Sequence, residues 1–375
     1  MKIEEFKAGT WEKRYQYESF EPSLINTEWT WDSPKIHLAL ERATRALGEL
    51  NAFSLIVPDV DLFVQMHIVK EAQTSSKIEG TQTQMDEALM SKDLIQPEKR
   101  DDWQEVQNYI QAMNSAIAGL SRLPLSNRLL RETHAVLVSG VRGREKQPGE
   151  FRTSQNWIGG SNLNDAAFVP PHHEGLPVLM RDLEEFWHND MILVPHLIRI
   201  AISHYQFETI HPFLDGNGRI GRLMIPLYLM SHGVLEKPSL YISDFFERYR
   251  SSYYDALMAV RMRNDLTHWV LFFLQAVEET SKKGCMVFKG ILRFREEAQS
   301  KIMKLGRRAE LAVQLLNLLY RNPIQTAQNI ETHLNISKST VNLLIKDFLD
   351  AGLIKEVTGK KRGQVFAMND YLTLF

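Results

Sequence analysis

One twelve-residue stretch, residues 211–222, combines residue types that could act on a phosphate group. It reads His-Pro-Phe-Leu-Asp-Gly-Asn-Gly-Arg-Ile-Gly-Arg. Gly216 and Gly218 can adopt positive φ and let backbone N–H groups converge on an anion. The apolar run that follows, Ile220 to Met230, predicts a helix whose N-terminus points at the same place and favours negative charge there. The stretch therefore predicts an anion-binding turn at the start of a helix.

The side chains of the same stretch suit the chemistry of a nucleotide. Arg219 and Arg222 lie one helical turn apart, and their planar guanidinium groups can hold phosphate oxygens. Asp215 offers the oxygen ligand that Mg²⁺ prefers. His211 precedes Asp215 by four residues and could accept a proton from an incoming hydroxyl. Together these residues predict transfer of a phosphate-containing group; the alternative is a tight turn that opens a helix and carries solvated arginines.

The stretch resembles the signature HPFx(D/E)GNGRxxR of Fic-domain proteins, with every fixed position matched. The resemblance implies a mainly α fold, a Fic-type helical bundle with a small β-hairpin flap, and transfer of AMP from ATP to a protein hydroxyl. It implies that His211 is the general base, that Asp215 holds Mg²⁺, and that Asn217, Arg219 and Arg222 hold phosphates. The motif residues expected in the nucleotide site are Asp215, Gly216, Asn217, Gly218, Arg219, Gly221 and Arg222.

A second stretch lies upstream, where a helix predicted over residues 59–76 ends. It reads Ser-Ser-Lys-Ile-Glu-Gly at residues 75–80 and resembles the inhibitory pattern (S/T)xxxE(G/N) of the same family, with Ser75, Glu79 and Gly80 in the fixed places. A glutamate at a helix end could pair with Arg222 and occupy the guanidinium meant for the γ-phosphate. We therefore expect Glu79 to lie in the nucleotide site and to inhibit the protein; the alternative is an ordinary surface glutamate.

Residues 141–171 are rich in glycine and proline. Two short β-like runs, 157–158 and 167–169, flank Gly159, Gly160 and Ser161 and predict a β-hairpin. By resemblance this hairpin is the flap, which holds a target segment through backbone hydrogen bonds, and these three residues belong to the nucleotide site. Residues 148–152 and 170–171 resemble the family's flanks to the flap. The alternative is a structural hairpin edge.

Tyr253 and Tyr254 resemble the paired tyrosines that flank the adenosine in the family. An aromatic face could cover a purine. Two core or surface tyrosines on a helix are the alternative. Some members carry asparagine where this chain has Arg261, so the ribose and base contacts are left open.

The bulk composition describes an ordinary globular protein of two or three domains. Of its 375 residues 44% are hydrophobic and 24% charged, and the net charge of −2 creates no field that would draw the whole chain to nucleic acid or membrane. The single cysteine, Cys285, fits a reducing compartment. The sequence shows no apolar signal segment and no apolar run long enough for a membrane span, so we expect a cytoplasmic protein. It contains no HExxH pattern, so zinc chemistry is not expected.

The chain divides into four predicted segments. Residues 1–100 form an N-terminal arm, irregular over residues 1–33, followed by the inhibitory helix; residues 101–290 form the Fic catalytic core; residues 291–308 form a connecting helix. Residues 309–375 predict three helices and a pair of strands around a basic turn, as in a winged helix-turn-helix domain. That domain could bind DNA through residues 337–342 and the wing Lys360-Lys361-Arg362, or serve protein contact or dimerisation.

The resulting expectation is an enzyme that transfers AMP from ATP, with Mg²⁺, to Ser, Thr or Tyr hydroxyls of target proteins and of itself, restrained by Glu79. Three alternatives stay open. The same site could remove AMP from a modified protein by a water that Glu79 orients, it could use another phosphate donor, or the chain could be a DNA-binding regulator that only senses a nucleotide. The expected partner is a target protein that presents a hydroxyl, and the sequence does not name it. A homodimer and DNA contact through residues 309–375 stay open, and no membrane contact is expected.

Overall fold

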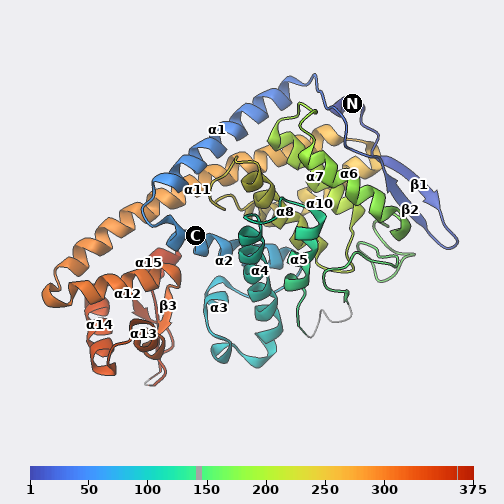
Figure 1. Cartoon of the computed structure of the whole chain (residues 1–375). Coiled ribbons are helices and arrows are strands. Elements are labelled where there is room, and N and C mark those ends of the chain that lie inside the picture. The colour runs from blue at the N-terminus through green and yellow to red at the C-terminus, as the bar shows by residue number, and fades with distance from the viewer. Residues whose placement is uncertain (141–145, 361) are drawn as a thin grey trace.

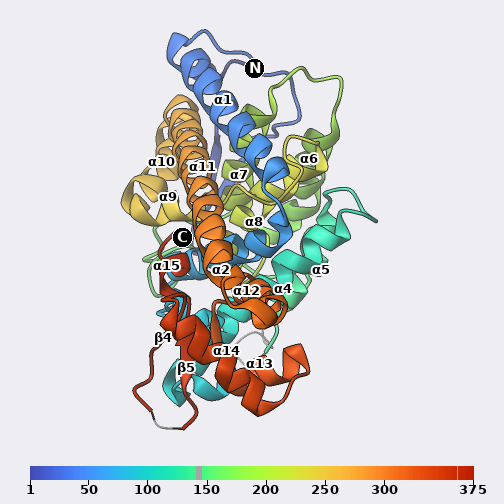
Figure 2. The ribbon, with the colours of Figure 1, turned by 90° about the vertical axis from the view of Figure 1, so that its left-hand side faces the viewer.

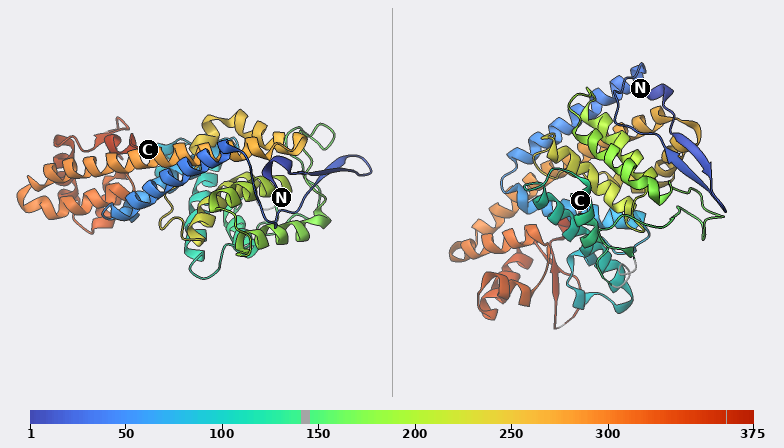
Figure 3. Two further views of the ribbon diagram at one scale, coloured as in Figure 1. Left: turned by 90° about the horizontal axis from the view of Figure 1, so that it is seen from above. Right: turned by 45° about the vertical axis from the view of Figure 1, so that its right-hand side comes forward.

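The structure, a computed structural model, describes residues 1–140, 146–360 and 362–375, and it is mainly helical as predicted (Figure 1). Two long helices, α1 (Pro34–Ile56) and α11 (Leu266–Met303), lie side by side (Figure 1, Figure 3). Their close approach depends on Gly284, where a Cβ would come within 2.7 Å of Leu50 Cδ1. None of the helices in the described part of the chain is long and apolar enough to cross a membrane.

The central helix is α7 (His196–Ile210), whose residues 197–210 are all buried. It packs against α6 (Leu176–His188), α8 (Asn217–Ser231) and α11. The short 3-10 helix η5 (His173–Gly175) leads into α6. Helices α9 (Ser243–Arg248) and α10 (Arg250–Arg263) follow α8 and pack on α11. The end of the most buried element therefore presents His211.

The helix that carries the inhibitory pattern is α2 (Val60–Ile78). It packs between α4 (Arg100–Gly119), α9 and helix α12 (Ala309–Arg321) of the C-terminal module (Figure 2). The chain reaches α4 through α3 (Met85–Leu89) and the 3-10 helices η2 (Lys92–Leu94) and η3 (Pro97–Lys99). Helix α5 (Asn127–Leu137) packs on α4, and Ser126 caps it by accepting a hydrogen bond from the Leu129 N–H.

The N-terminal arm is more ordered than expected. After the 3-10 helix η1 (Ile3–Glu5), strands β1 (Gly9–Lys13) and β2 (Glu18–Pro22) pair antiparallel with Trp11 opposite Phe20. The prediction of an irregular segment over residues 1–33 was therefore wrong for this hairpin. The strands form because Phe20 buries its ring against Phe168, at a centroid distance of 5.6 Å. That contact comes from a distant part of the chain.

The C-terminal module lies at the far end of α11 (Figure 1). It comprises η6 (Gly306–Arg308), α12 (Ala309–Arg321), β3 (Ile324–Thr326), α13 (Ala327–Leu334), α14 (Lys338–Asp350), β4 (Lys355–Glu356), β5 (Val365–Ala367) and α15 (Asn369–Leu372). The strands form an antiparallel sheet in the order β3-β5-β4. The three helices α12, α13 and α14 and the strands β4 and β5 follow one another as predicted, whereas β3 and α15 were not predicted. Lys361 of the expected wing lies outside the described residues. Helix α11 runs unbroken across residue 290, where a separate connecting helix was expected.

Candidate active site

The loop between α7 and α8 carries the catalytic motif. His211 ends α7 in the left-handed conformation, with φ of 51°, and donates its backbone N–H to Phe207 O at 2.9 Å. Gly216 has φ of 75° and precedes the first residue of α8. A Cβ at Gly216 would also press on Val138 Cγ1 at 3.2 Å. Since the first backbone N–H groups of a helix lack intrahelical partners, the start of α8 presents donors beside His211.

Asn217 holds this loop together with its side chain. Its amide nitrogen donates to Phe213 O and its amide oxygen accepts from Phe213 N, both at 2.8 Å, and the residue is 2% exposed. The resemblance implied that Asn217 holds a phosphate. In the structure both polar atoms of its side chain are already used by the loop, so only its backbone N–H, at the helix start, is placed for an anion.

Arg152 fixes the backbone around His211 from the flank of the flap. The guanidinium donates to His211 O at 3.0 Å and to Pro171 O at 2.6 Å, and the Arg152 N–H donates to Pro212 O at 2.9 Å. Burial lowers the pKa of Arg152 to about 10. Asn156 adds two further bonds, to the carbonyls of His211 and Phe213. Sequence reasoning placed Arg152 only in a flank motif and gave it no role.

His134 on α5 supports the loop from the other side. Its Nδ1 accepts from the Gly149 N–H at 3.0 Å, so Nε2 carries the proton and donates to Asp215 O at 3.0 Å. The ring stacks on Phe213 with centroids 3.8 Å apart. Burial lowers the pKa of His134 to about 4, which keeps this arrangement in place at neutral pH. No pattern in the sequence pointed to this residue.

The imidazole of His211 is held in its neutral form. Burial lowers its pKa to about 3, with further lowering from the positive charges of Arg261 and Arg152, while Glu79 acts in the opposite direction. A neutral imidazole can accept a proton at pH 7. The site therefore contains a base that is ready without prior deprotonation.

Arg222 is the most enclosed charge of the site, and Glu79 pairs with it. Its Nη2 lies 2.6 Å from Glu79 Oε1, while Ser75 accepts two more hydrogen bonds, at Oγ (2.9 Å) and at the backbone oxygen (3.0 Å). The Arg222 side chain is 1% exposed. Burial alone would lower its pKa, but Glu79 and neighbouring groups raise it above its usual value. Conversely, burial would raise the pKa of Glu79, yet Arg222 and Arg219 hold it below its usual value.

The Glu79 carboxylate lies on the first turn of α8. A Cβ at Gly218 would overlap Glu79 Oε1 and come within 3.0 Å of Arg222 Nη1, so only glycine allows the carboxylate this close. Gly80 has φ of 108° and donates to Lys77 O at 3.0 Å, which ends α2 and directs Glu79 toward α8. The end of α2 therefore brings Ser75 and Glu79 into contact with Arg222.

Arg219 is also held by carboxylates. Its Nη1 donates to Glu105 Oε2 of α4 at 3.1 Å, and its Nη2 lies 3.6 Å from Asp215 Oδ1. The Arg219 side chain is 6% exposed, whereas the Asp215 carboxylate is 48% exposed and accepts the Gly216 N–H. Asp215 is therefore the open oxygen donor of the loop. Sequence reasoning did not single out Glu105.

The flap is a hairpin closed by one bridge. Ile158 and Phe168 exchange backbone hydrogen bonds of 2.9 and 3.1 Å, so the prediction of a hairpin is confirmed, although the two expected strands reduce to a single pair. Gly159 and Gly160 take φ of 70° and 71°, and the Asp165 carboxylate accepts the Ser161 N–H to close the tip.

A buried arginine connects the flap to the catalytic helix. The Arg261 guanidinium lies 4.1 Å from the centre of the Phe168 ring and donates to Glu208 O at 2.9 Å and Thr209 Oγ1 at 3.1 Å. Burial lowers its pKa. Arg261 therefore joins the base of the flap to the last turn of α7.

Two residues that were expected to contact the nucleotide, Tyr253 and Gly221, take part in core packing instead. The Tyr253 hydroxyl is 2.9 Å from His204 Nε2 and its ring stacks on Phe246 at 4.3 Å, whereas the neighbouring Tyr254 is 38% exposed. At Gly221 a Cβ would overlap Glu208 Oε1, so this glycine serves the packing of α8 on α7. Helical geometry separates Tyr253 and Tyr254 by about 100°, which lets one of them be buried while the other is partly exposed.

This combination of a helical bundle, a glycine-flanked turn at a helix start and a glutamate that covers the turn defines a protein of the Fic type. Two family profiles match the chain: the Fic/DOC family N-terminal over residues 37–118 and the Fic/DOC family over residues 124–229, together about half of its length. The chain belongs to the Fic/DOC family.

Solved structures share this fold. A Fic family protein from Desulfovibrio desulfuricans G20 superposes with a TM-score of 0.56 at 19% identity, over 90% of this chain and 96% of that one. A Fic domain containing signaling protein from Bacteroides thetaiotaomicron gives 0.53 at 19% identity, over 66% of this chain and 98% of that one.

Curated relatives share a segment of the sequence. "Protein adenylyltransferase Fic" from Aedes aegypti is 35% identical over 133 residues, and the protein of the same name from Culex quinquefasciatus is 34% identical over 133 residues. These matches cover 35% of this chain but only 24% of each relative. The chain thus spans about a quarter of the length of those relatives.

Proposed function

We propose that this protein transfers AMP from ATP to hydroxyl side chains of target proteins and of itself. One observation carries the proposal: a neutral imidazole, His211, stands beside a helix N-terminus where two enclosed arginines, Arg219 and Arg222, already hold carboxylates. A position that attracts carboxylates in the free protein suits phosphates equally well. The name shared by the curated relatives supports the same activity.

In the proposed reaction His211 accepts the proton of the target hydroxyl. The hydroxyl oxygen attacks the α-phosphorus of ATP, the bond to the bridging oxygen breaks, and pyrophosphate leaves. Arg219, Arg222 and the first N–H groups of α8, including those of Asn217 and Gly218, would hold the phosphate oxygens. Their contribution is positioning and stabilisation of charge, as in other phosphoryl transfers.

Asp215 is the residue that would hold Mg²⁺. It is a half-exposed carboxylate beside the helix start, which is the hard oxygen donor that this ion needs, and the phosphates and water would supply the other ligands. When bound, Mg²⁺ would neutralise charge on the phosphates.

The Glu79–Arg222 pair would restrain this activity. The guanidinium donates to both Ser75 and Glu79, so the γ-phosphate of ATP would have to displace a carboxylate to reach it. Release of Glu79 would then be the activating step. Removal of AMP from a modified protein, by a water that Glu79 orients, is the competing outcome of the same site.

For the C-terminal module we propose a protein-contact role. The exposed face of α14 carries Lys338 and Lys346, but also Leu343, which is 51% exposed, and Leu349, which is 38% exposed. Exposed leucines on this helix favour a protein partner, a second copy of the chain included, over DNA. A salt-dependent shift of a DNA duplex by the full chain would instead support a DNA-binding regulator.

The test is incubation of the chain with α-³²P-ATP and Mg²⁺, followed by mass spectrometry. We expect an added AMP on a hydroxyl side chain that increases in Glu79→Gly and is lost in His211→Ala. Incubation of the labelled chain with the unlabelled wild type measures AMP removal. Absence of labelling in both the wild type and Glu79→Gly would contradict the transferase proposal.

A further inference from the structure

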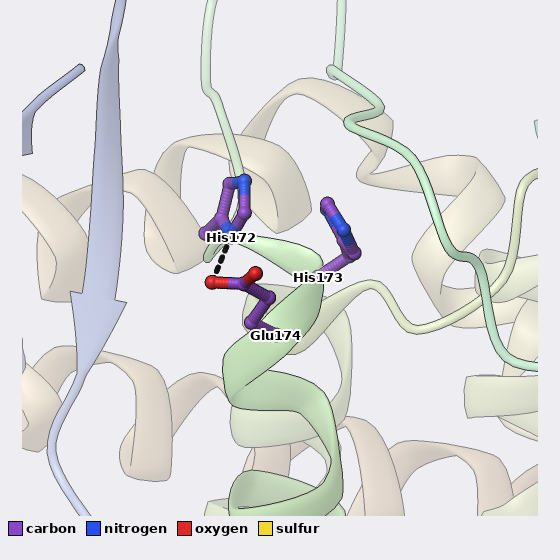
Figure 4. A group of neighbouring side chains, drawn as sticks. All are labelled: His172, His173 and Glu174. Atoms are coloured by element: carbon purple, nitrogen blue, oxygen red, sulfur yellow. Dashed lines mark ion pairs between the residues drawn. The ribbon is translucent and has the colours of Figure 1, made fainter.

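A group of three metal-ligand residues lies outside the nucleotide site, at the junction between the flap and α6. His172, His173 and Glu174 follow the prolines that end the flap, and the 3-10 helix η5 turns their side chains toward one another (Figure 4). One ligand atom of each lies within 4.8 Å of those of the other two. The two imidazole rings have centroids 4.2 Å apart, and His172 Nδ1 lies 3.6 Å from Glu174 Oε2.

The protein's own contacts leave this group incompletely satisfied. His173 Nδ1 is buried and has no hydrogen-bond partner among the residues that the structure describes. A buried ring nitrogen without a partner is unfavourable unless a ligand satisfies it.

We propose that His172, His173 and Glu174 bind one divalent transition-metal ion, of which Zn²⁺ is the representative. Two imidazole nitrogens and one carboxylate oxygen are ligands that Zn²⁺, Co²⁺ and Ni²⁺ prefer, whereas Mg²⁺ prefers oxygen ligands alone. The Glu174 side chain is 82% exposed and that of His172 is 25% exposed, so an ion can enter from solvent and keep water as its remaining ligand.

The surrounding structure holds the turn from which these ligands project. Glu21 of β2 accepts the His172 N–H at 3.1 Å, and a Cβ at Gly175 would lie 3.7 Å from the other Glu21 oxygen, so this carboxylate lies against the turn. On the opposite flank, Arg152 donates to the carbonyl of Pro171, the residue before His172, at 2.6 Å. The same guanidinium donates to His211 O. An ion at this site would therefore stiffen a turn that is one residue from an anchor of the catalytic loop.

The experiment measures binding alone, so its result does not depend on whether the chain transfers AMP. The full chain without an affinity tag is stripped with a chelator and titrated with ZnCl₂ by calorimetry in the presence of excess Mg²⁺. We expect one ion per chain, and a visible absorbance with CoCl₂ typical of nitrogen and oxygen ligands. His172→Ala and Glu174→Gln should each weaken Zn²⁺ binding by about tenfold or more, and the double variant of His172 and His173 to alanine should abolish it.

The matched control is His333→Ala, which removes an exposed histidine of α13. Circular dichroism and thermal unfolding check that each variant folds, and Zn²⁺ should raise the melting temperature of the wild type and the control but not that of the double variant. Binding that the double variant retains, or that His333→Ala reduces as much as His172→Ala does, would overturn the proposal. So would the absence of binding to the wild type.

Discussion

Replacing Glu79 by glutamine tests the proposed role of the Glu79–Arg222 pair most directly, because it removes the charge and keeps the shape of the side chain. Loss of one partner of a hydrogen-bonded ion pair costs about 2–5 kcal/mol when the pair is fully buried. Arg222 is 1% exposed but Glu79 is 35% exposed, so solvent screening places this pair near the lower end, about 2 kcal/mol. In the proposed mechanism, ATP must break this pair in order to bind to the wild type, whereas it need not do so in order to bind to Glu79→Gln.

That free energy corresponds to about a 30-fold difference in affinity. We therefore expect Glu79→Gln to bind ATP with Mg²⁺ about 30-fold more tightly than the wild type, as measured by calorimetry on the apo chains. The control is Glu98→Gln, an exposed carboxylate of η3. Without ATP the variant should unfold at a lower temperature, since Arg222 keeps its bonds to Ser75 but loses the opposing charge.

The result that refutes this reasoning is equal or weaker ATP binding by Glu79→Gln, with the control unchanged. In that case Arg222 would not be the group that ATP must reach. Tighter ATP binding without an increase in labelling would have a different meaning. The Glu79–Arg222 pair would then limit nucleotide binding, and another element would limit the transfer of AMP.

Burial raises the pKa of Glu208 to about 7. The folded state therefore keeps a proton that the unfolded state releases above about pH 4.5. As a result, the free energy of unfolding falls by up to about 3 kcal/mol as the pH rises from about 4.5 through 7. Glu208→Gln should therefore raise the urea midpoint of unfolding at about pH 8 and leave it unchanged near pH 4. An equal rise of the midpoint at both pH values would disprove the link between the Glu208 proton and stability. Gly221→Ala inserts a Cβ against Glu208 and should cost about 1–3 kcal/mol in thermal unfolding; an unchanged melting temperature would mean that α7 and α8 separate easily. Asn217→Ala leaves the Phe213 N–H without its partner and removes one of the two hydrogen bonds to Phe213 O, the other of which comes from Asn156, so we expect about 1–3 kcal/mol of destabilisation together with loss of labelling. Lost labelling at full stability would instead indicate that Asn217 contacts the phosphates.

The parts of the site that the sequence predicts are the parts built from neighbouring residues. The turn at Gly216, the helix that follows it and the glutamate at the end of α2 depend on local backbone preferences, and each lies where the pattern placed it. Glu79 and Arg222 lie 143 residues apart in the sequence. Their pairing could nevertheless be predicted, because each residue belongs to a short motif of the same family.

The contacts that fix the loop were not predictable in the same way. His134 reaches Asp215 across 81 residues, and Arg152 reaches His211 across 59. Neither residue belongs to a periodic sequence pattern that would show whether its side chain makes a buried hydrogen bond or lies on the surface. The N-terminal hairpin was missed for a related reason, because four of the five residues of β1 are exposed and its partner strand owes its order to Phe168.

A motif also identifies a residue without saying where its side chain points. Asn217 and Tyr253 occupy motif positions, yet the side chain of one is used by the loop and that of the other by the core. In both cases the position matches the family and the contact differs from the implied one. Motif matches therefore establish which segments meet, and the direction of each side chain has to come from the structure.

The position of α2 indicates how Glu79 would leave Arg222. Helix α2 is packed along its length by α4, α9 and α12, and Phe63 near its start lies 5.1 Å from the Tyr320 ring of the C-terminal module. Withdrawing the whole helix would expose several such side chains, at about 1.5–3 kcal/mol for each large apolar group, which far exceeds the roughly 2 kcal/mol of the ion pair. Glu79 follows the last residue of α2 and precedes Gly80, where a Cβ would meet nothing within 4 Å. A local change of the last turn around Gly80 therefore releases the carboxylate at much lower free energy than movement of the helix.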